Sequence, residues 1–329
     1  MSRFGAAILG CAGPRLTTEE CRFFRDFAPF GFILFARNVQ STDQLRALTA
    51  EMRDAVGRPA PIFIDQEGGR VQRLRPPIAR DWPPPMDHVA LAGDSAERSL
   101  ALRAAIIATE LLALGIDGNC VPALDVARPD THPVLRNRLL GDDPATVARL
   151  GRAVAQAHLD AGVLPVMKHM PGHGRGTLDS HAALPRTDAP AHALRADFAP
   201  FAALSDLPLG MTAHMVFSAY DDRPATTSRV MIDLIRRDIG FAGLLMTDDI
   251  SMQALSGDVA DRGRAALAAG CDAVLHCNGD LPEMRRLAEA AGQMTTAAQA
   301  RADAALAASQ TPAAVDIASA AEELAALTQ

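Results

Sequence analysis

The sequence predicts an α/β fold, a single-domain (β/α)8 TIM-type barrel. Short runs of consecutive apolar residues recur along the chain, and stretches with helical periodicity lie between them. Apolar runs that alternate with helices are typical of a parallel sheet covered by helices. The chain has 329 residues, more than the ~250 that are typical of such a barrel. A doubly wound open sheet is the alternative.

Eight apolar runs are the predicted strands. In chain order they are AAILG (6–10), GFILF (31–35), PIFID (61–65), GNCVPALDV (118–126), VLPVMK (163–168), LPLGMTA (207–213), GLLMTD (243–248) and DAVLHC (272–277). Their number matches the eight strands that a closed barrel requires.

The intervening segments are predicted to form amphipathic helices. Their apolar residues recur at a spacing near 3.6, and Ser or Thr stands at or near the start of each. Clear examples are TTEECRFFRDF (17–27), STDQLRALTAEMRDAV (41–56), SAERSLALRAAIIATELLALG (95–115) and ATVARLGRAVAQAHLDAG (145–162).

No segment has the composition of an interdomain linker. We therefore expect residues 1–329 to form one catalytic barrel domain, with an Ala-rich helical C-terminal segment from about residue 286.

Composition narrows the class of ligand. The formal net charge is −7, and acidic and basic residues are interspersed, so no basic tract suits nucleic acid or a membrane surface. Only 4% of the residues are aromatic, which disfavours stacking platforms for long polysaccharides. No apolar run approaches the ~20 residues of a membrane helix. A small or neutral, short ligand is expected.

The cysteines indicate a reducing compartment. The chain has five, they are scattered, and none forms a CxxC pair. Residues 8–11 resemble a lipoprotein signal, but the apolar run before Cys11 is too short for one, and we interpret it as the first strand. A cytoplasmic protein is therefore expected.

Polar residues follow several of the predicted strands. Asp65 ends the third apolar run, Lys168 and His169 end the fifth, His214 follows the sixth, and Asp248 ends the seventh. Active sites of these barrels form at the carboxyl ends of the strands, so these side chains are expected to meet at one mouth. Three residues of this region also have a structural interpretation: Asp65 as a turn cap, His214 as a hydrogen-bonded core residue, and Asp249 as the N-cap of a helix over ISMQAL (250–255).

Residues 168–181, KHMPGHGRGTLDSH, form a predicted loop at this mouth. Pro171 and the glycines break both helical and strand periodicity, while three histidines, a lysine and an aspartate supply titratable groups. Ordered polar loops on a rigid scaffold often carry binding and catalytic residues.

Two classes of reaction fit such a mouth. One is glycoside hydrolysis, in which a carboxylate attacks the anomeric carbon and a second group protonates the leaving oxygen. The other is metal-assisted hydrolysis, with candidate ligands His169, His173, His181, His214 and Asp248. No paired histidines follow the first strand, as they usually do in barrel metallohydrolases, so we expect neither a metal nor another cofactor. A sugar-binding protein without turnover is the non-enzymatic alternative.

Five motifs in this chain resemble those of the glycoside hydrolase family 3 β-N-acetylglucosaminidases. They are IDQEGGRVQRL (64–74), NRLLGDDP (137–144), KHMPGHGRGTLDSH (168–181), MTAHMVF (211–217) and MTDDISM (246–252), and the resemblance extends from GFILFARN (31–38) to DAVLHCN (272–278). It implies a (β/α)8 barrel, a cytoplasmic location and the removal of terminal β-linked N-acetylglucosamine from peptidoglycan fragments, typically from 1,6-anhydro-N-acetylmuramic acid that carries a stem peptide.

The resemblance also implies roles for individual residues. Asp248 would be the nucleophile that forms a covalent glycosyl-enzyme, and His181 the general acid and base, oriented by Asp179. The residues that hold the sugar hydroxyls would be Asp65, Arg73, Arg138, Lys168 and His169. The chain departs from the family pattern around Arg138, where it has VLRNR followed by two leucines.

A β-N-acetylglucosaminide phosphorylase remains an alternative to a hydrolase. A histidine acid and base does not repel an anionic acceptor such as phosphate, as a second carboxylate would. In either case the expected partner is a small sugar or muropeptide substrate, and the expected state is a monomer.

Overall fold

The computed structural model describes residues 3–178, 183–309, 311 and 315–328. In this part of the chain eight parallel strands close into a barrel, in the order β1, β12, β11, β9, β7, β6, β3, β2. They are β1 (Gly5–Leu9), β2 (Pro29–Leu34), β3 (Ile62–Ile64), β6 (Gly118–Asn119), β7 (Leu164–Met170), β9 (Leu209–Thr212), β11 (Leu244–Asp249) and β12 (Ala273–His276). Each corresponds to one predicted apolar run, so the predicted barrel is confirmed.

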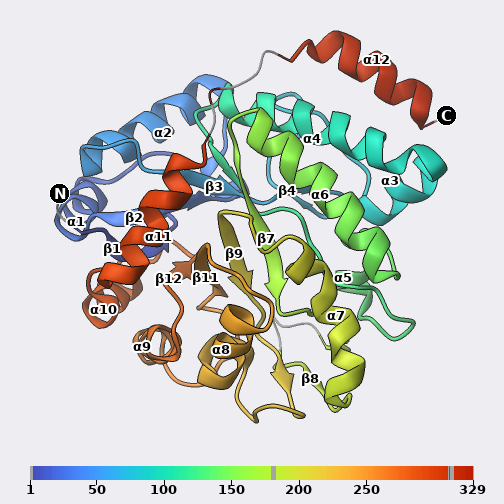
Figure 1. Ribbon diagram of the computed structural model, residues 1–329. Helices are drawn as coiled ribbons and strands as arrows, with labels where there is room; N and C mark the ends of the chain where they lie inside the picture. Colours follow the sequence, from blue (N-terminus) through green and yellow to red (C-terminus); the bar gives the residue numbers. More distant parts are fainter. Residues whose placement is uncertain (1–2, 179–182, 310, 312–314, 329) are drawn as a thin grey trace.

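Helices surround the strands (Figure 1). They are α1 (Thr18–Phe27), α2 (Thr42–Val56), α4 (Ala96–Leu112), α6 (Pro144–Asp160), α7 (Ala191–Ala203), α8 (Arg229–Arg237), α9 (Val259–Ala269) and α10 (Leu281–Ala291). Thr17 and Ser41 cap α1 and α2 as their positions predict, because each side chain accepts a hydrogen bond from a backbone N–H of the first turn. Ser95, before α4, makes no such bond.

The fourth strand is shorter than the apolar run 118–126 suggests. Its ladder includes only Gly118 and Asn119, and Ala123 makes an isolated bridge to Lys168 further along. Pro122 has no N–H to donate, and this interrupts the pairing. The residues after it curve over the end of the barrel and carry Asp125 toward the mouth.

Alternate residues of the strands face two different cores. Ala6 and Ile8 of β1 belong to the core inside the barrel, while Ala7 and Leu9 pack outward against the helices. This alternation follows from the period of two of a β-strand. Inside, the side chains fill the space, so the barrel is a packed core and its functional groups must lie at its ends.

Small elements occupy the loops between strands and helices. The strands β4 (Gln66–Gly68) and β5 (Val71–Gln72) form an antiparallel hairpin after β3, and β8 (Arg186–Thr187) pairs in parallel with β10 (Val216–Phe217). The short helices are α3 (Pro85–Ala92), α5 (Pro133–Arg136) and the 3-10 turns at 36–38, 93–95 and 225–227.

The Ala-rich C-terminal part contains two further helices, α11 (Thr296–Ala307) and α12 (Ile317–Leu327). Ala298, Ala302 and Ala305 of α11 are buried in the same core as the barrel interior. The backbone N–H of Met294, just before α11, donates to the carbonyl of Phe4, just before β1. This places α11 across the amino end of the barrel, where alanine permits close approach.

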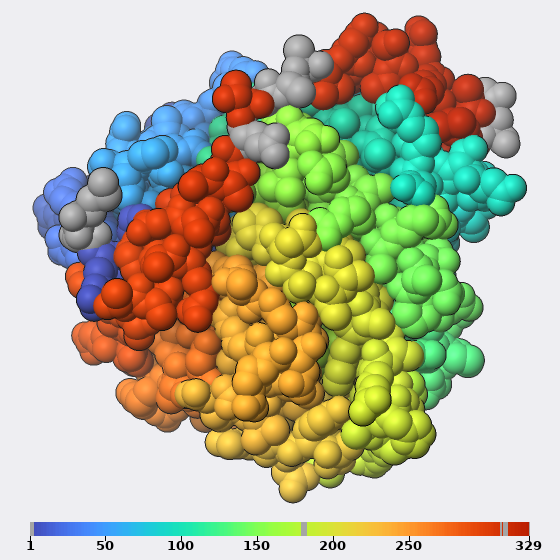
Figure 2. Space-filling view, in the orientation of Figure 1, coloured from blue at the N-terminus to red at the C-terminus, as the bar shows by residue number. Residues whose placement is uncertain are grey.

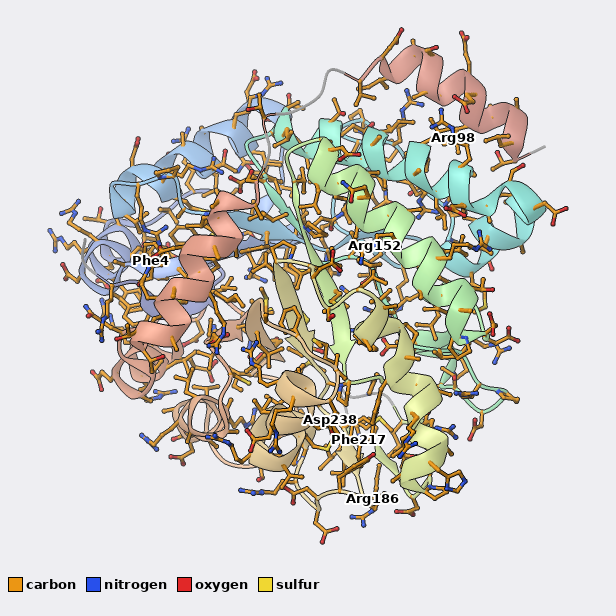
Figure 3. The ribbon with its side chains drawn as sticks, in the orientation of Figure 1. Phe4, Arg98, Arg152, Arg186, Phe217 and Asp238 are labelled. Atoms are coloured by element: carbon orange, nitrogen blue, oxygen red, sulfur yellow. The ribbon has the colours of Figure 1, made fainter. Side chains whose placement is uncertain are left out.

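Helix α12 lies on the outer surface of α4 and forms a separate ridge in the space-filling view (Figures 1 and 2). Arg98 of α4 faces α12 (Figure 3), and its guanidinium donates to both carboxylate oxygens of Glu323 at 2.7 and 2.8 Å. No helix in the described residues is both long and apolar enough to cross a membrane.

We expect Asp272 to be important for stability at the amino end of the barrel. It precedes β12 and is buried, and it accepts hydrogen bonds from Arg236 of α8 at 2.6 Å and from Arg301 of α11 at 2.8 Å. Asp272→Asn should lower the free energy of unfolding by about 3 kcal/mol, because it leaves two partly buried cations without their carboxylate. Urea denaturation measures this change.

A matched control is Asp233→Asn on α8. Asp233 pairs with Arg229 at 3.0 Å, but the side chains are 36% and 65% exposed, so the change should be within about 0.5 kcal/mol of zero. Equal effects of the two substitutions would contradict the importance assigned to Asp272.

Candidate active site

A pocket opens at the carboxyl ends of the barrel strands. It is lined by side chains from several strand ends and by residues of the loops that follow β3, β6 and β7. The polar residues in its lining are Asp65, Arg70, Arg73, His132, Arg138, Lys168, His169, His173, Asp248 and Asp249. The structure therefore brings Asp65, Arg73, Arg138, Lys168, His169 and Asp248 together, as the sequence predicted.

Asp65 directly follows β3 and lies between two cations. Its Oδ1 accepts a hydrogen bond from Lys168 Nζ at 2.9 Å, and its Oδ2 accepts one from Arg73 Nη2 at 2.9 Å. Burial alone would raise the pKa of Asp65, but Lys168 and Arg73 hold it far below its ordinary value. Asp65 is therefore ionised at neutral pH and fixes both cations at the pocket floor.

Glu67 lies one layer behind this floor. Its side chain is 2% exposed, and its two oxygens accept hydrogen bonds from Arg138 Nε at 2.8 Å and Arg138 Nη2 at 2.7 Å. The same carboxylate lies 2.5 Å from Lys168 Nζ. Burial would raise the pKa of Glu67, but Arg138 and Lys168 lower it to about 2. Arg138, in the loop after β6, thus reaches the pocket through a buried bidentate ion pair.

Lys168 is the most deeply buried cation of the pocket, with a side chain that is 2% exposed. Burial by itself would lower its pKa, but Asp65 and Glu67 outweigh burial and raise it. Lys168 therefore stays protonated and cannot serve as a neutral base. One of its N–H groups donates to Asp65, and Glu67 lies in ion-pair contact with the same nitrogen, so N–H capacity remains for a ligand.

Asp125 orients His169. Its Oδ2 lies 2.7 Å from His169 Nδ1, and its Oδ1 accepts hydrogen bonds from the backbone N–H groups of His169 and His173. Burial would raise the pKa of Asp125, but His169 lowers it, so Asp125 is ionised. An ionised carboxylate accepts only, so His169 Nδ1 carries a proton, and Nε2 is the ring nitrogen that is left to face a ligand.

Asp248, at the end of β11, is a pocket carboxylate that has no cation within ion-pair distance among the described residues. Its Oδ1 accepts a hydrogen bond from the backbone N–H of Asp249 at 2.8 Å. Burial would raise its pKa, but nearby His169 and His214, this N–H group and Lys168 hold it below the ordinary value. Asp248 is therefore a carboxylate at neutral pH.

The two neighbours of Asp248 have structural partners. Asp249 accepts hydrogen bonds from the backbone N–H and hydroxyl groups of Ser251, and residues 250–255 form turns and bends, so the predicted helix N-cap role of Asp249 is wrong. His214 is buried between the Thr226 hydroxyl at 2.7 Å and the Asp249 carbonyl at 3.0 Å, and burial lowers its pKa. The structural interpretation of His214 therefore fits its contacts.

His173 lies on the loop after β7. Burial lowers the pKa of His173 to about 4, so this ring is neutral above that pH. Asp179 and His181, the predicted positioning and acid–base residues, lie outside the described residues. Among the described residues, no group of three or more His, Cys, Asp or Glu side chains is placed to hold a metal ion.

Sequence reasoning missed Glu67 and Asp125. Glu67 stands within the IDQEGGRVQRL motif, two residues after Asp65, and Asp125 stands at the end of the fourth apolar run. The rule that directed attention to strand ends would have found Asp125 if it had been applied to the fourth strand. Glu67 carried no comparable signal, because a residue behind the pocket floor is recognised only by its contacts.

We predict that Asp125→Asn changes the tautomer of His169. The asparagine amide would place an N–H donor where the carboxylate accepted. The proton of the neutral His169 ring would then move from Nδ1 to Nε2, and Nε2 would become a donor. Nitrogen-15 NMR of the imidazole nitrogens near pH 7 measures this, with the exposed His192 on α7 as an internal reference. A wild-type His169 that is protonated on Nε2, with no change in Asp125→Asn, would contradict the assignment.

Comparison with known proteins identifies the family. Residues 22–308 match the glycosyl hydrolase family 3 N-terminal domain. A β-hexosaminidase of Alkalilimnicola ehrlichii is 40% identical over 282 residues, which cover 83% of this chain and 81% of the relative. A β-hexosaminidase of Bordetella avium is 38% identical over 287 residues, with the same two coverages.

Solved structures agree with this relationship. NagZ from Neisseria gonorrhoeae, solved in complex with N-trifluoroacetyl-D-glucosamine, superposes with a TM-score of 0.85 at 32% identity, and 99% of each chain is covered. A family 3 β-N-acetylglucosaminidase from Paenibacillus superposes with a TM-score of 0.86 at 29% identity over 98% of this chain and 67% of that one. With its barrel, its pocket of charged side chains and these relatives, the chain belongs to glycoside hydrolase family 3, among the β-N-acetylhexosaminidases.

Proposed function

We propose that the protein is a retaining exo-β-N-acetylglucosaminidase that acts on peptidoglycan fragments. It would remove the non-reducing terminal β-linked N-acetylglucosamine from 1,6-anhydro-N-acetylmuramyl peptides, as a cytoplasmic monomer engaged in peptidoglycan recycling. The observation that carries the retaining mechanism is Asp248, an ionised carboxylate that lines the pocket at the end of β11 and has no cationic partner among the described residues. The Neisseria relative was solved in complex with N-trifluoroacetyl-D-glucosamine, and this ligand supports N-acetylglucosamine as the sugar that the protein removes.

The first step forms a covalent intermediate. The Asp248 carboxylate attacks the anomeric carbon while the bond from that carbon to the leaving oxygen breaks, and His181 gives its proton to that oxygen. In the second step His181 takes a proton from water, and the water oxygen displaces Asp248. The sugar is released with its original anomeric configuration because the carbon is inverted twice.

The pocket floor would hold the sugar hydroxyls. Asp65 accepts, while Arg73, Arg138 and Lys168 donate, and His169 faces the sugar through Nε2 on account of Asp125. A neutral sugar has no charge of its own for recognition, so donors and acceptors at fixed angles must select it. Charged groups form stronger hydrogen bonds than neutral ones, which favours this set of side chains.

The products of the reaction test this proposal. The protein is incubated with an N-acetylglucosaminyl-β-1,4-(1,6-anhydro)muramyl peptide, with and without phosphate, and the released sugar is identified by mass. Free N-acetylglucosamine in both samples is expected. N-acetylglucosamine 1-phosphate in the phosphate sample would identify a phosphorylase, and binding without release would identify a sugar-binding protein.

We predict that His181→Ala has an effect that depends on the leaving group. On the sugar-linked substrate kcat/KM should fall roughly 10²-fold to 10⁴-fold, because the departing alkoxide needs a proton. On an activated aryl glycoside the first step should be much less impaired, and hydrolysis of the intermediate should limit the rate. Asp179→Asn should give a milder form of the same pattern. Steady-state and burst kinetics on both substrates measure this.

The control for this prediction is His192→Ala, which removes an exposed histidine of α7 that does not line the pocket. It should leave both substrates unaffected. Equal losses of His181→Ala on both substrates, in both steps, would show that the proton comes from another group.

A further inference from the structure

We propose that Glu67 is a positioning residue for catalysis, which fixes the directions in which Lys168 and Arg138 present their N–H groups to the sugar. This inference rests on the proposed function, because it takes both cations as sugar-binding residues. Glu67 does not line the substrate pocket itself. It would therefore act on the substrate only through the two cations.

Glu67 accounts for the orientation of both side chains. Its two oxygens accept from Nε and Nη2 of Arg138, which defines the plane of the guanidinium and directs the remaining N–H groups away from Glu67. The carboxylate also contacts Lys168 Nζ at 2.5 Å, while Asp65 accepts from the same nitrogen at 2.9 Å. The ammonium group is thus held between two carboxylates, which fixes the position of Nζ at the pocket floor.

The main chain of Glu67 is fixed as well. Arg103 of α4 is buried and donates through Nη2 to the carbonyl oxygens of Glu67 at 2.6 Å and Pro83 at 2.9 Å. Gly68 permits this contact, because its φ is +108° and an added Cβ would collide with the Arg103 guanidinium. The backbone of Glu67 is thus fixed, so its carboxylate can fix the positions of Lys168 and Arg138.

Glu67 also balances charge at the pocket floor. The floor contains three cations, Lys168, Arg138 and Arg73, and their carboxylate partners are Asp65 and Glu67. The transition state of glycoside hydrolysis carries positive charge on the sugar ring. Without the charge of Glu67, Asp65 alone would pair with the three cations. The excess positive charge at the floor would then oppose the positive charge that develops on the sugar ring.

The experiment compares Glu67→Gln with Asp272→Asn. Both carboxylates are buried and form ion pairs with two cationic side chains, but Asp272 lies at the opposite end of the barrel. Values of kcat and KM are measured with an aryl β-N-acetylglucosaminide and with the sugar-linked substrate, together with the inhibition constant of N-acetylglucosamine and the melting temperature of each variant.

For Glu67→Gln we expect kcat/KM to fall about 10²-fold, the effect of misplacing binding groups by about an ångström. The loss should be equal on both substrates, because the cations hold the sugar that both share, and the inhibition constant should rise. Asp272→Asn should lower the melting temperature but leave the kinetics of the folded protein unchanged. In an Arg138→Met background the loss from Glu67→Gln should be smaller by about tenfold, because the two residues act together.

Other results would overturn the inference. A Glu67→Gln variant that is destabilised with wild-type kinetics, as expected for Asp272→Asn, would show a structural residue only. Additive losses in the double variant, or a loss confined to the sugar-linked substrate, would also contradict it. If Glu67→Gln does not fold, Glu67→Asp keeps the charge but is too short for both contacts, and wild-type kinetics there would reject the proposal. A wild-type protein that cleaves neither substrate would instead reject the proposed function.

Discussion

The active site depends on a buried network of alternating charges at the carboxyl end of the barrel. Arg73, Asp65, Lys168, Glu67 and Arg138 follow one another through ion pairs of 2.5 to 2.9 Å. Removing such charges from water costs several kcal/mol for each ion, and only close pairing with further hydrogen bonds offsets that cost. A network of this kind is weak evidence for stability. It is better explained by the need to keep donors and acceptors at fixed positions before the substrate arrives.

The barrel makes this network possible, because it brings distant parts of the chain to one mouth. Asp65 follows β3, Lys168 belongs to β7, and Arg138 comes from the loop after β6. The barrel interior is packed with apolar side chains, and α11 covers the opposite end. The residues that stabilise the fold and those that form the active site thus lie at opposite ends of the barrel. Asp272 joins two helices to the strands at the amino end, and the charge network forms the pocket at the carboxyl end.

Sequence reasoning predicted the barrel because its signal is repeated: eight apolar runs alternate with helices, and one misjudged run does not alter the pattern. The early end of β6, before Pro122, was not predicted, because an apolar run in the sequence does not show where the hydrogen-bonded ladder of the strand ends. The pocket residues at strand ends were predicted for the same geometric reason. Glu67 and Asp125 were not, since their roles follow from contacts with residues far away in sequence. Asp179 and His181 remain predictions, because they lie outside the described residues.

The central claim is that Asp248 is the nucleophile that the charge network serves. It is tested most directly by trapping the covalent intermediate with a 5-fluoro-N-acetylglucosaminyl fluoride, followed by digestion and sequencing of the labelled peptide by mass spectrometry. A carboxylate that attacks the anomeric carbon should retain the sugar as an ester, because the 5-fluorine slows both steps while the fluoride leaving group speeds only the first. The account predicts a single label on Asp248 in the peptide GLLMTDDISM (243–252). A label on Asp249 or on any other residue would contradict it.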